Sequence, residues 1–172
     1  MGFDVHFFAK EEGEKLFLAV QVIEGTTVYE PIIEERDAIS GATFYENTLE
    51  AYLLALDIIE AEEFDDVVLI NQNRLIFDWL RKKRHDNVLR DRYYKNIKGM
   101  MSQLVQENET TFGSKVVKGD KNEAKKALKD YMKTREVEVN DLTDLFKDIG
   151  DATSTKKGRS SDKVIKFKRK AN

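Results

Sequence analysis

The chain of 172 residues contains no cysteine, which excludes disulfide bonds, thiolate metal sites and thiol catalysis. No apolar run reaches membrane-spanning length, and the opening residues MGFDVHFFAK predict a strand and not a signal peptide. The nine glycines are scattered, so there is neither a glycine-rich phosphate loop nor a nucleophile elbow. We therefore expect a cytoplasmic protein without these common catalytic devices.

Proline occurs once, at Pro31, and basic residues are scarce in the first 70 positions. That segment carries 17 Asp or Glu against 3 Lys or Arg, a net charge of −14. The remaining 102 residues carry a net charge of +11. An acidic first part would repel a phosphate backbone and suits a basic partner surface, although the acids could equally solvate outer faces of the fold.

The stretch from residue 44 to residue 83 organises the chain. Apolar residues recur at helical spacing from Leu49 to Ile59, and Asn47 and Thr48 stand where capping residues belong. Residues 67–70 form a short β-branched run typical of a buried strand, and a second helix follows through Leu75, Ile76, Trp79 and Leu80. This alternation predicts a layered α/β domain.

The flanking segments complete the predicted order of elements. Residues 3–9, 16–23 and 28–33 predict three antiparallel strands joined by short turns. After the charged connection 81–86, the apolar spacing predicts a third helix through residues 93–104, a strand at 112–117 and a helix at 122–132.

This order resembles the ribonuclease H fold over residues 3–133. Two motifs support the resemblance: Asn47-Thr48-Leu49-Glu50-Ala51 opening the first helix, with Ala55-Leu56 after it, and Val117-Lys118-Gly119 before Asn122-Glu123 and Leu128. The resemblance implies a mixed five-stranded sheet with helices on both faces. The antiparallel meander of three strands would come first, then helix, strand, helix, and then helix, strand, helix. A C-terminal helix and a basic tail would follow.

The family's chemistry does not carry over. Ribonuclease H holds two metal ions with four carboxylates, because hard divalent cations need several charged oxygens. The resemblance places these ligands at Lys10, Glu50, Gln72 and Lys126, of which only Glu50 is a carboxylate. We therefore expect no metal, no cofactor and no nuclease activity. An active ribonuclease with ligands relocated to Glu11, Glu12 or Asp120 is the alternative, and His6 and His85 show no metal-ligand spacing.

Two segments are candidates for binding nucleic acid. Tyr93 and Tyr94 lie among the basic residues Arg90, Arg92 and Lys95, which is typical either of a stacking surface or, as we favour, of an amphipathic helix with one buried tyrosine. Residues 151–172 predict a disordered tail, and from Thr153 onward they contain eight basic residues and one acid. Its densest basic run includes Lys166, Lys168 and Arg169.

Residues 135–150 predict a separate C-terminal helix, capped by Asn140 or Asp141 and stopped by Gly150. Leu142, Leu145 and Phe146 share one face. Asp144-Leu145-Phe146 also resembles the end of the peptide by which replication proteins dock on the bacterial sliding clamp, where a Leu-Phe pair anchors in an apolar pocket. The alternative is a small helix that packs on its own core.

The sequence therefore predicts three regions: a ribonuclease H-like domain at 1–134, a helical segment at 135–150 and a tail at 151–172. The favoured function is a non-catalytic protein resembling phage-encoded inhibitors that bind the sliding clamp in the host bacterial cytoplasm and block access to DNA. A nucleic-acid-binding accessory protein is the alternative, and a dimer is left open. The residues expected to bind the clamp are Leu142, Asp144, Leu145, Phe146, Glu60, Glu62, Glu63, Asp65 and Asp66.

Overall fold

The computed structural model describes the backbone of residues 2–149 and the side chains of residues 2–136. One mixed sheet contains all its strands, in the order β3-β2-β1-β5-β6, with β4 also paired to β2. β1 pairs antiparallel with β2 and parallel with β5, which in turn pairs parallel with β6. The strands are β1 (Phe3–Glu12), β2 (Lys15–Glu24), β3 (Thr27–Val28), β4 (Ile32–Asp37), β5 (Asp66–Asn71) and β6 (Thr111–Val116).

The predicted third strand is divided in two. β3 and β4 both pair with the same edge of β2, through Ile23↔Val28 and through Val20↔Ile32, and Pro31 lies between them. Proline has no backbone N–H to give to a strand ladder, so pairing stops there and resumes at Ile32. The sheet is thus five strands wide, and the predicted mixed α/β fold is confirmed.

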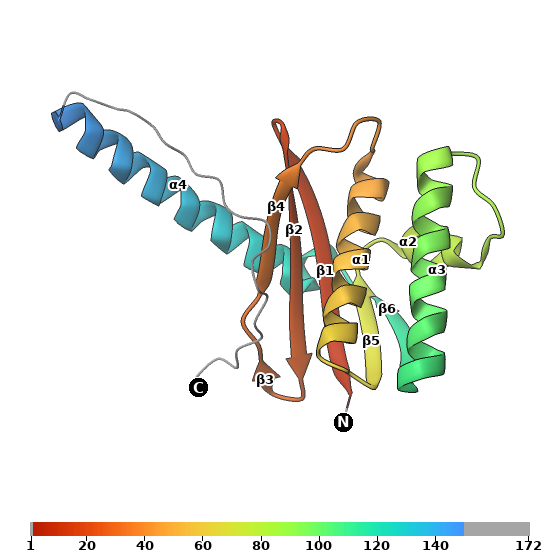
Figure 1. The fold of residues 1–172 in the computed structure, drawn as a ribbon. Helices are drawn as coiled ribbons and strands as arrows, with labels where there is room; N and C mark the ends of the chain where they lie inside the picture. The colour runs from red at the N-terminus through yellow and green to blue at the C-terminus, as the bar shows by residue number, and fades with distance from the viewer. Residues whose placement is uncertain (1, 150–172) are drawn as a thin grey trace. The chain divides into compact units, whose positions relative to one another are not determined.

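Helices cover both faces of this sheet, and Figure 1 shows α1 and α3 side by side on one face and the start of α4 on the other. The sheet, α1, α3 and α4 as far as Leu128 belong to one compact unit, and a second unit begins at Lys129. No helix in the described part of the chain is long and apolar enough to span a membrane. The helices are α1 (Phe44–Ala61), α2 (Arg74–Asp78), η1 (Trp79–Arg81), α3 (Val88–Asn108), η2 (Gly119–Lys121) and α4 (Glu123–Ile149).

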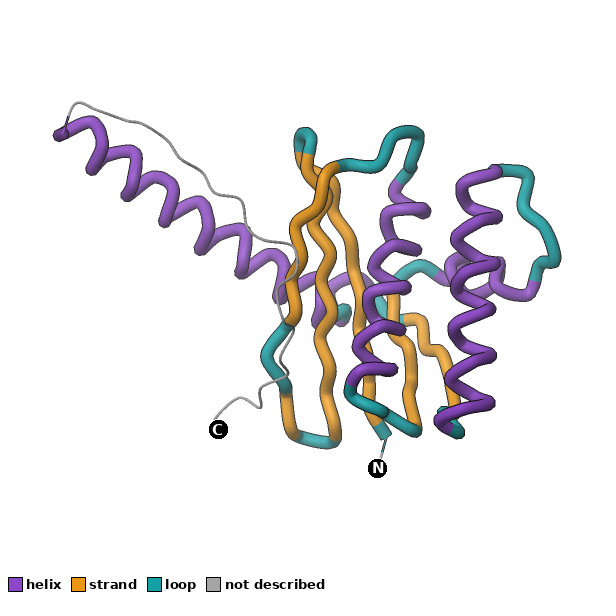
Figure 2. The backbone as a smooth tube through the Cα atoms, viewed as in Figure 1, coloured by secondary structure: helices purple, strands orange, loops and turns teal. Residues whose placement is uncertain are grey.

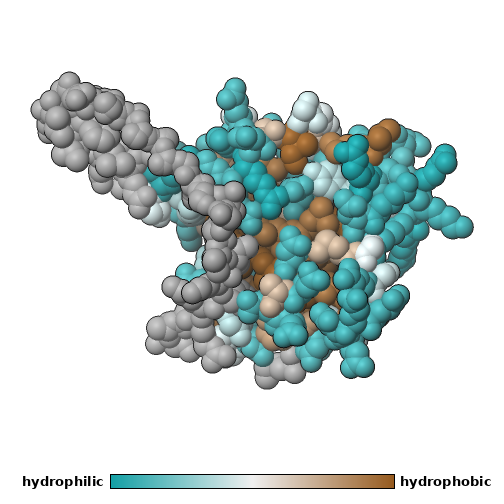
Figure 3. All heavy atoms as spheres, in the orientation of Figure 1, coloured by the Kyte–Doolittle hydropathy of each residue, from teal (hydrophilic) through white to brown (hydrophobic). Residues whose placement is uncertain are grey.

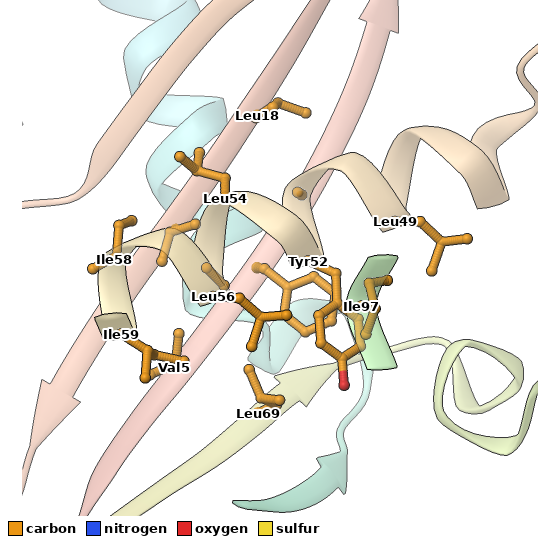
Figure 4. Packing of buried hydrophobic residues seen from close by; sticks show 14 of the residues in the cluster. Val5, Leu18, Leu49, Tyr52, Leu54, Leu56, Ile58, Ile59, Leu69 and Ile97 are labelled. Atoms are coloured by element: carbon orange, nitrogen blue, oxygen red, sulfur yellow. The ribbon is translucent and has the colours of Figure 1, made fainter. Parts of the chain in front are cut away.

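The core lies between the sheet and the pair α1 and α3. Figure 4 shows Tyr52 and Leu56 of α1 directed toward Leu69 of β5, beside Ile97 of α3. All four side chains are at most 1% exposed, so each contributes roughly 2 kcal/mol by leaving water. The apolar residues that predicted α1 from sequence are those that fill this layer.

The predicted start of α1 was wrong by one turn. Thr43 is the N-cap, and its Oγ1 accepts a hydrogen bond from Tyr45 N at 3.2 Å, while Glu46 Oε1 accepts one from Thr43 N at 2.7 Å. This reciprocal capping box satisfies helix donors that Asn47 and Thr48 were expected to satisfy. The aromatic residues Phe44 and Tyr45 therefore belong to the first turn.

The separate C-terminal helix was also wrong. α4 runs without interruption from Glu123 to Ile149, so neither Asn140 nor Asp141 caps a new helix. Asn122 caps the start of α4, where a helix was predicted, with its Oδ1 accepting hydrogen bonds from Ala124 N at 3.0 Å and Lys125 N at 3.3 Å. The side chains of residues 137–149, and all of residues 150–172, lie outside the described structure.

Candidate functional site

Three side-chain amides meet where β1, β5 and the start of α4 come together. Asn71, the last residue of β5, donates from Nδ2 to the carbonyl oxygen of Phe7 in β1 at 2.8 Å. Asn122 donates from Nδ2 to the same oxygen at 3.1 Å and to Gln72 Oε1 at 2.7 Å. Asn71 and Asn122 are fully buried, and we call them, with Gln72, the amide cluster.

The amide cluster is electrically neutral, and the polar atoms of its two buried asparagines have hydrogen-bond partners. Asn71 Oδ1 accepts a hydrogen bond from Asn73 N at 2.9 Å, and Asn122 Oδ1 caps α4. Next to it, Nδ1 of the buried His6 accepts a hydrogen bond from Glu123 N at 3.1 Å, which requires that nitrogen to be unprotonated. The amides therefore hold this junction mainly through backbone groups of β1, Asn73 and α4, with one bond between Asn122 and Gln72.

The four positions that the resemblance assigned to metal ligands have separate partners. Gln72 belongs to the amide cluster, and Lys126 pairs with Glu123 at 2.9 Å on the first turns of α4. Lys10 pairs with Glu12 at 3.6 Å on β1. Glu50 pairs with Arg36 of β4.

Glu50 is the only carboxylate among these four positions. Because Thr43 caps α1, Glu50 lies in the second helical turn, where it lines a cleft of about 560 Å³ between α1 and α3. Asn47, one turn earlier on α1, reaches β1 and donates from Nδ2 to Glu11 Oε1 at 3.1 Å. Figure 3 shows hydrophobic atoms exposed near the centre of the face that carries these helices, with hydrophilic atoms around them.

The structure does not bring together Glu11, Glu12 and Asp120, the acids considered as alternative metal ligands. Glu11 contacts Asn47, Glu12 contacts Lys10, and Asp120 lies exposed in η2. Among the described residues, no group of three or more His, Cys, Asp or Glu is placed to hold a metal ion. His85 lies elsewhere, stacked on Tyr94 with ring centroids 4.6 Å apart.

Of the two interpretations of Tyr93 and Tyr94, the structure does not support the stacking surface, because both tyrosines are buried. Tyr93 is 9% exposed and Tyr94 1%, and Tyr94 donates its hydroxyl to Ile76 O at 2.6 Å. The interpretation of an amphipathic helix is correct, but it buries two tyrosines and not one. Arg92 is exposed, and Lys95 pairs with Asp91 at 3.0 Å. Lys166, Lys168 and Arg169 lie outside the described residues.

Sequence reasoning missed the role of Arg90. Its Nε donates to Oε2 of the fully buried Glu46 at 2.7 Å, and its guanidinium carbon lies 4.3 Å from the ring centre of Trp79 and 5.1 Å from that of Tyr45. Burial raises the pKa of Glu46, but the hydrogen bonds from Thr43 and Arg90 outweigh it and lower that pKa overall. Trp79, the single tryptophan of the sequence, was the only sequence signal for these contacts of Arg90.

The five acids expected to bind the partner lie at one end of the sheet. Figure 2 shows the N-terminus, the β2–β3 turn, the α1–β5 link and the α3–β6 link gathered there. We call this the acidic end and define it as residues 2–5, 22–29, 59–67 and 106–112, which contain no Lys or Arg. Its acids are Asp4, Glu24, Glu60, Glu62, Glu63, Asp65, Asp66, Glu107 and Glu109.

Two features of the acidic end oppose stability. α1 and α3 both finish there with no basic residue in the last turn, so acids face the negative ends of two helix dipoles. Glu63 and Glu109, with φ of 54° and 55°, are the only non-glycine residues of the described chain with positive φ. Leu142, Asp144, Leu145 and Phe146, the other residues expected to bind the partner, fall within α4, where side chains are not described.

Comparison with known proteins finds likeness in structure only. No family model matches the sequence, and no curated protein matches it. Among solved structures, the ribonuclease H1 of the archaeon Halobacterium salinarum superimposes with a TM-score of 0.60 at 17% identity, over 76% of this chain and 99% of that one. The N-terminal ribonuclease H domain of Rv2228c from Mycobacterium tuberculosis gives 0.59 at 12% identity, over 72% and 92%.

A third structure, LC11 ribonuclease H1 in complex with an RNA/DNA hybrid, gives a TM-score of 0.55 at 12% identity, over 70% of this chain and 88% of that one. Similarity at such identities concerns the backbone arrangement and not the chemistry. Together with the strand order and the helices on both faces, it establishes that this chain has a ribonuclease H-like fold.

Proposed function

We propose that this protein acts by binding and not by cleaving nucleic acid. The observation that carries the proposal is the neutral amide cluster at the sheet junction, with Lys126 beside it on α4. The positions assigned to metal ligands hold two lysines, one glutamate and one glutamine, a net charge of +1 where four carboxylates would give −4. Such a set lacks the charged oxygens that Mg²⁺ needs.

The partner we propose is a basic protein surface that normally binds nucleic acid. The acidic end supports it, because the five expected acids share their surface with four more carboxylates and no base. Of such partners we favour the bacterial sliding clamp, since a basic ring interior would meet the acidic end while its outer pocket takes Leu145 and Phe146. The protein would then act as a phage-type inhibitor that blocks DNA from the ring.

A second candidate is an accessory protein that binds nucleic acid. It is favoured by Arg81, Lys82, Lys83 and Arg84, which are all exposed beside Trp79, with Lys82 Nζ 5.8 Å from the indole ring centre. The LC11 enzyme of similar fold is known in complex with an RNA/DNA hybrid. The basic tail could add affinity that depends on salt.

Catalysis is tested by incubating the full chain with an RNA–DNA hybrid in Mg²⁺ or Mn²⁺. We expect no cleavage. Metal-dependent turnover that disappears in Glu50→Gln would overturn the proposal and support an active ribonuclease with relocated ligands.

Binding is tested by titration against immobilised clamp at two ionic strengths. Reversing Glu60, Glu62 and Glu63 to lysine should weaken binding most at low salt, whereas Leu145→Ala with Phe146→Ala should weaken it at both, by roughly 2 kcal/mol or more for each anchor. Absence of clamp binding at micromolar protein would exclude this partner. DNA binding that survives deletion of residues 153–172 would favour the second candidate.

A further inference from the structure

Among the described residues, none pairs with the outer side of strand β6. It is the last strand of the sheet, and no backbone hydrogen bond joins its outer side to any described residue. Thr111 N donates to Asp65 O at 2.8 Å and Val117 N to Asn71 O at 3.2 Å. The backbone N–H and C=O groups of the odd-numbered residues of β6 therefore point toward β5. The N–H and C=O groups of Phe112, Ser114 and Val116 therefore point to the open side.

The same three residues share the face of the sheet that α3 covers. Phe112 packs against the core, and alternation along a strand places Ser114 and Val116 on its side. Val116 is 42% exposed there. At the start of β6, Met101 and Val105 of α3 and Phe112 line a cleft of about 460 Å³, and Val105 is 49% exposed. The open backbone thus adjoins uncovered apolar surface.

We infer that β6 pairs antiparallel with β6 of a second copy of this chain. The charges that flank the strand favour a second copy of the chain as the partner and an antiparallel direction of pairing. Glu107 and Glu109 precede β6, whereas Lys118, Asp120 and Lys121 follow it with a net charge of +1. Antiparallel pairing places the acidic start of each strand beside the basic end of the other, whereas parallel pairing would bring like charges together.

The hydrophobic pattern sets the register. With Ser114 opposite Ser114 of the second copy, Phe112 lies opposite Val116, and all three pairs consist of residues whose backbone groups face outward. About six interchain hydrogen bonds result, since each such pair exchanges two. Both α3 helices then lie on the same side of one continuous sheet, and the cleft beside Phe112 of each copy faces Val116 of the other.

The substitution Ser114→Pro tests this contact without disturbing the fold. Ser114 does not donate to β5, so Ser114→Pro removes an outward N–H and leaves the β5–β6 ladder intact. Ser114→Ala is the matched control, because it keeps the N–H. Far-UV circular dichroism and thermal unfolding of both variants verify that each one folds.

The test is sedimentation equilibrium of the full chain at micromolar concentrations. We expect a dimer of twice 19.9 kDa for the wild type and for Ser114→Ala, and a dissociation constant at least about tenfold weaker for Ser114→Pro. Val116→Asp should weaken the dimer equally, whereas Val88→Asp, at a valine that is 74% exposed at the start of α3, should not. A monomeric wild type, or a dimer unaffected by both β6 substitutions, would overturn the inference.

Discussion

The backbone N–H of Glu123 donates to Nδ1 of His6 at 3.1 Å, which ties the first residue of α4 to the middle of β1. The bond exists only while that imidazole nitrogen is unprotonated. Burial lowers the pKa of His6, the nearby Glu123 and Asp4 act to raise it, and Lys115 and Lys126 act to lower it. The attachment of α4 to the sheet is thus sensitive to pH.

We predict that acid weakens the fold through His6. Because the folded pKa lies below the ordinary 6.5, the unfolded chain binds more protons, and the free energy of unfolding falls as pH drops below about 6.5. In His6→Gln, whose amide oxygen can accept the same bond without titrating, this dependence should be smaller in urea unfolding from pH 7 to pH 5. His85, whose pKa burial also lowers, contributes to the remainder. An unchanged pH profile would contradict this role.

The second prediction concerns Asn122. In Asn122→Asp the helix cap remains, but the donor to Phe7 O and Gln72 Oε1 becomes an acceptor, so the free energy of unfolding should fall by about 2 kcal/mol. Asn73→Asp is the control, since Asn73 caps α2 through Oδ1 alone, accepting from Leu75 N at 3.1 Å. Equal losses in the two variants, measured by urea unfolding, would show that the amide cluster adds nothing beyond capping.

The third prediction concerns Arg90. Arg90→Met leaves Glu46 buried without its cation and should lower the free energy of unfolding by about 3 kcal/mol at pH 7. Because the folded pKa of Glu46 lies below the ordinary 4.5, the ion pair stabilises the fold above that value, and its contribution is lost as pH falls through the folded pKa. The gap between variant and wild type should therefore narrow in acid. The exposed Arg92→Met should change stability by less than about 0.5 kcal/mol.

The fourth prediction concerns the acidic end. Glu109 has φ of 55°, a conformation that glycine adopts without strain, so Glu109→Gly should raise the free energy of unfolding by about 1 kcal/mol. Glu107→Gly removes the same charge from the last turn of α3 and should lower stability by about 1 kcal/mol. If both variants moved in the same direction in urea unfolding, charge and not backbone strain would dominate there. Weaker binding of both variants to a basic partner would show that the charges of Glu107 and Glu109 contribute to that binding.

The sequence was most informative where residues repeat with a period. The apolar spacing from Leu49 to Ile59 and the run Val67 to Ile70 predicted α1 and β5, because α1 buries one face in the core and β5 is a central strand with Val67, Leu69 and Ile70 buried. The order of elements and hence the fold followed from these patterns. Boundaries at Thr43 and within the predicted C-terminal helix did not, since caps depend on single hydrogen bonds that no periodicity reveals.

The candidate site was harder to predict, because it depends on which helix face meets the sheet. Asn47 and Glu50 are three residues apart, yet one contacts Glu11 of β1 and the other Arg36 of β4. A motif match fixes spacing along the chain and not rotation about the helix axis. Arg90 and Glu46 are 44 positions apart, so their pairing could not be inferred from local pattern.

Pro31 limits how many chains can join into one continuous sheet. Along the outer edge of β2, Pro31 interrupts the strand between β3 and β4, and Glu34, Glu35, Arg36 and Asp37 follow it. An interrupted, charged edge is a poor template for another strand, whereas β6 on the other side is a continuous one. Chains joined through β6 would expose only the interrupted edge at each end. The assembly would therefore stop at a closed pair and not extend into a fibre.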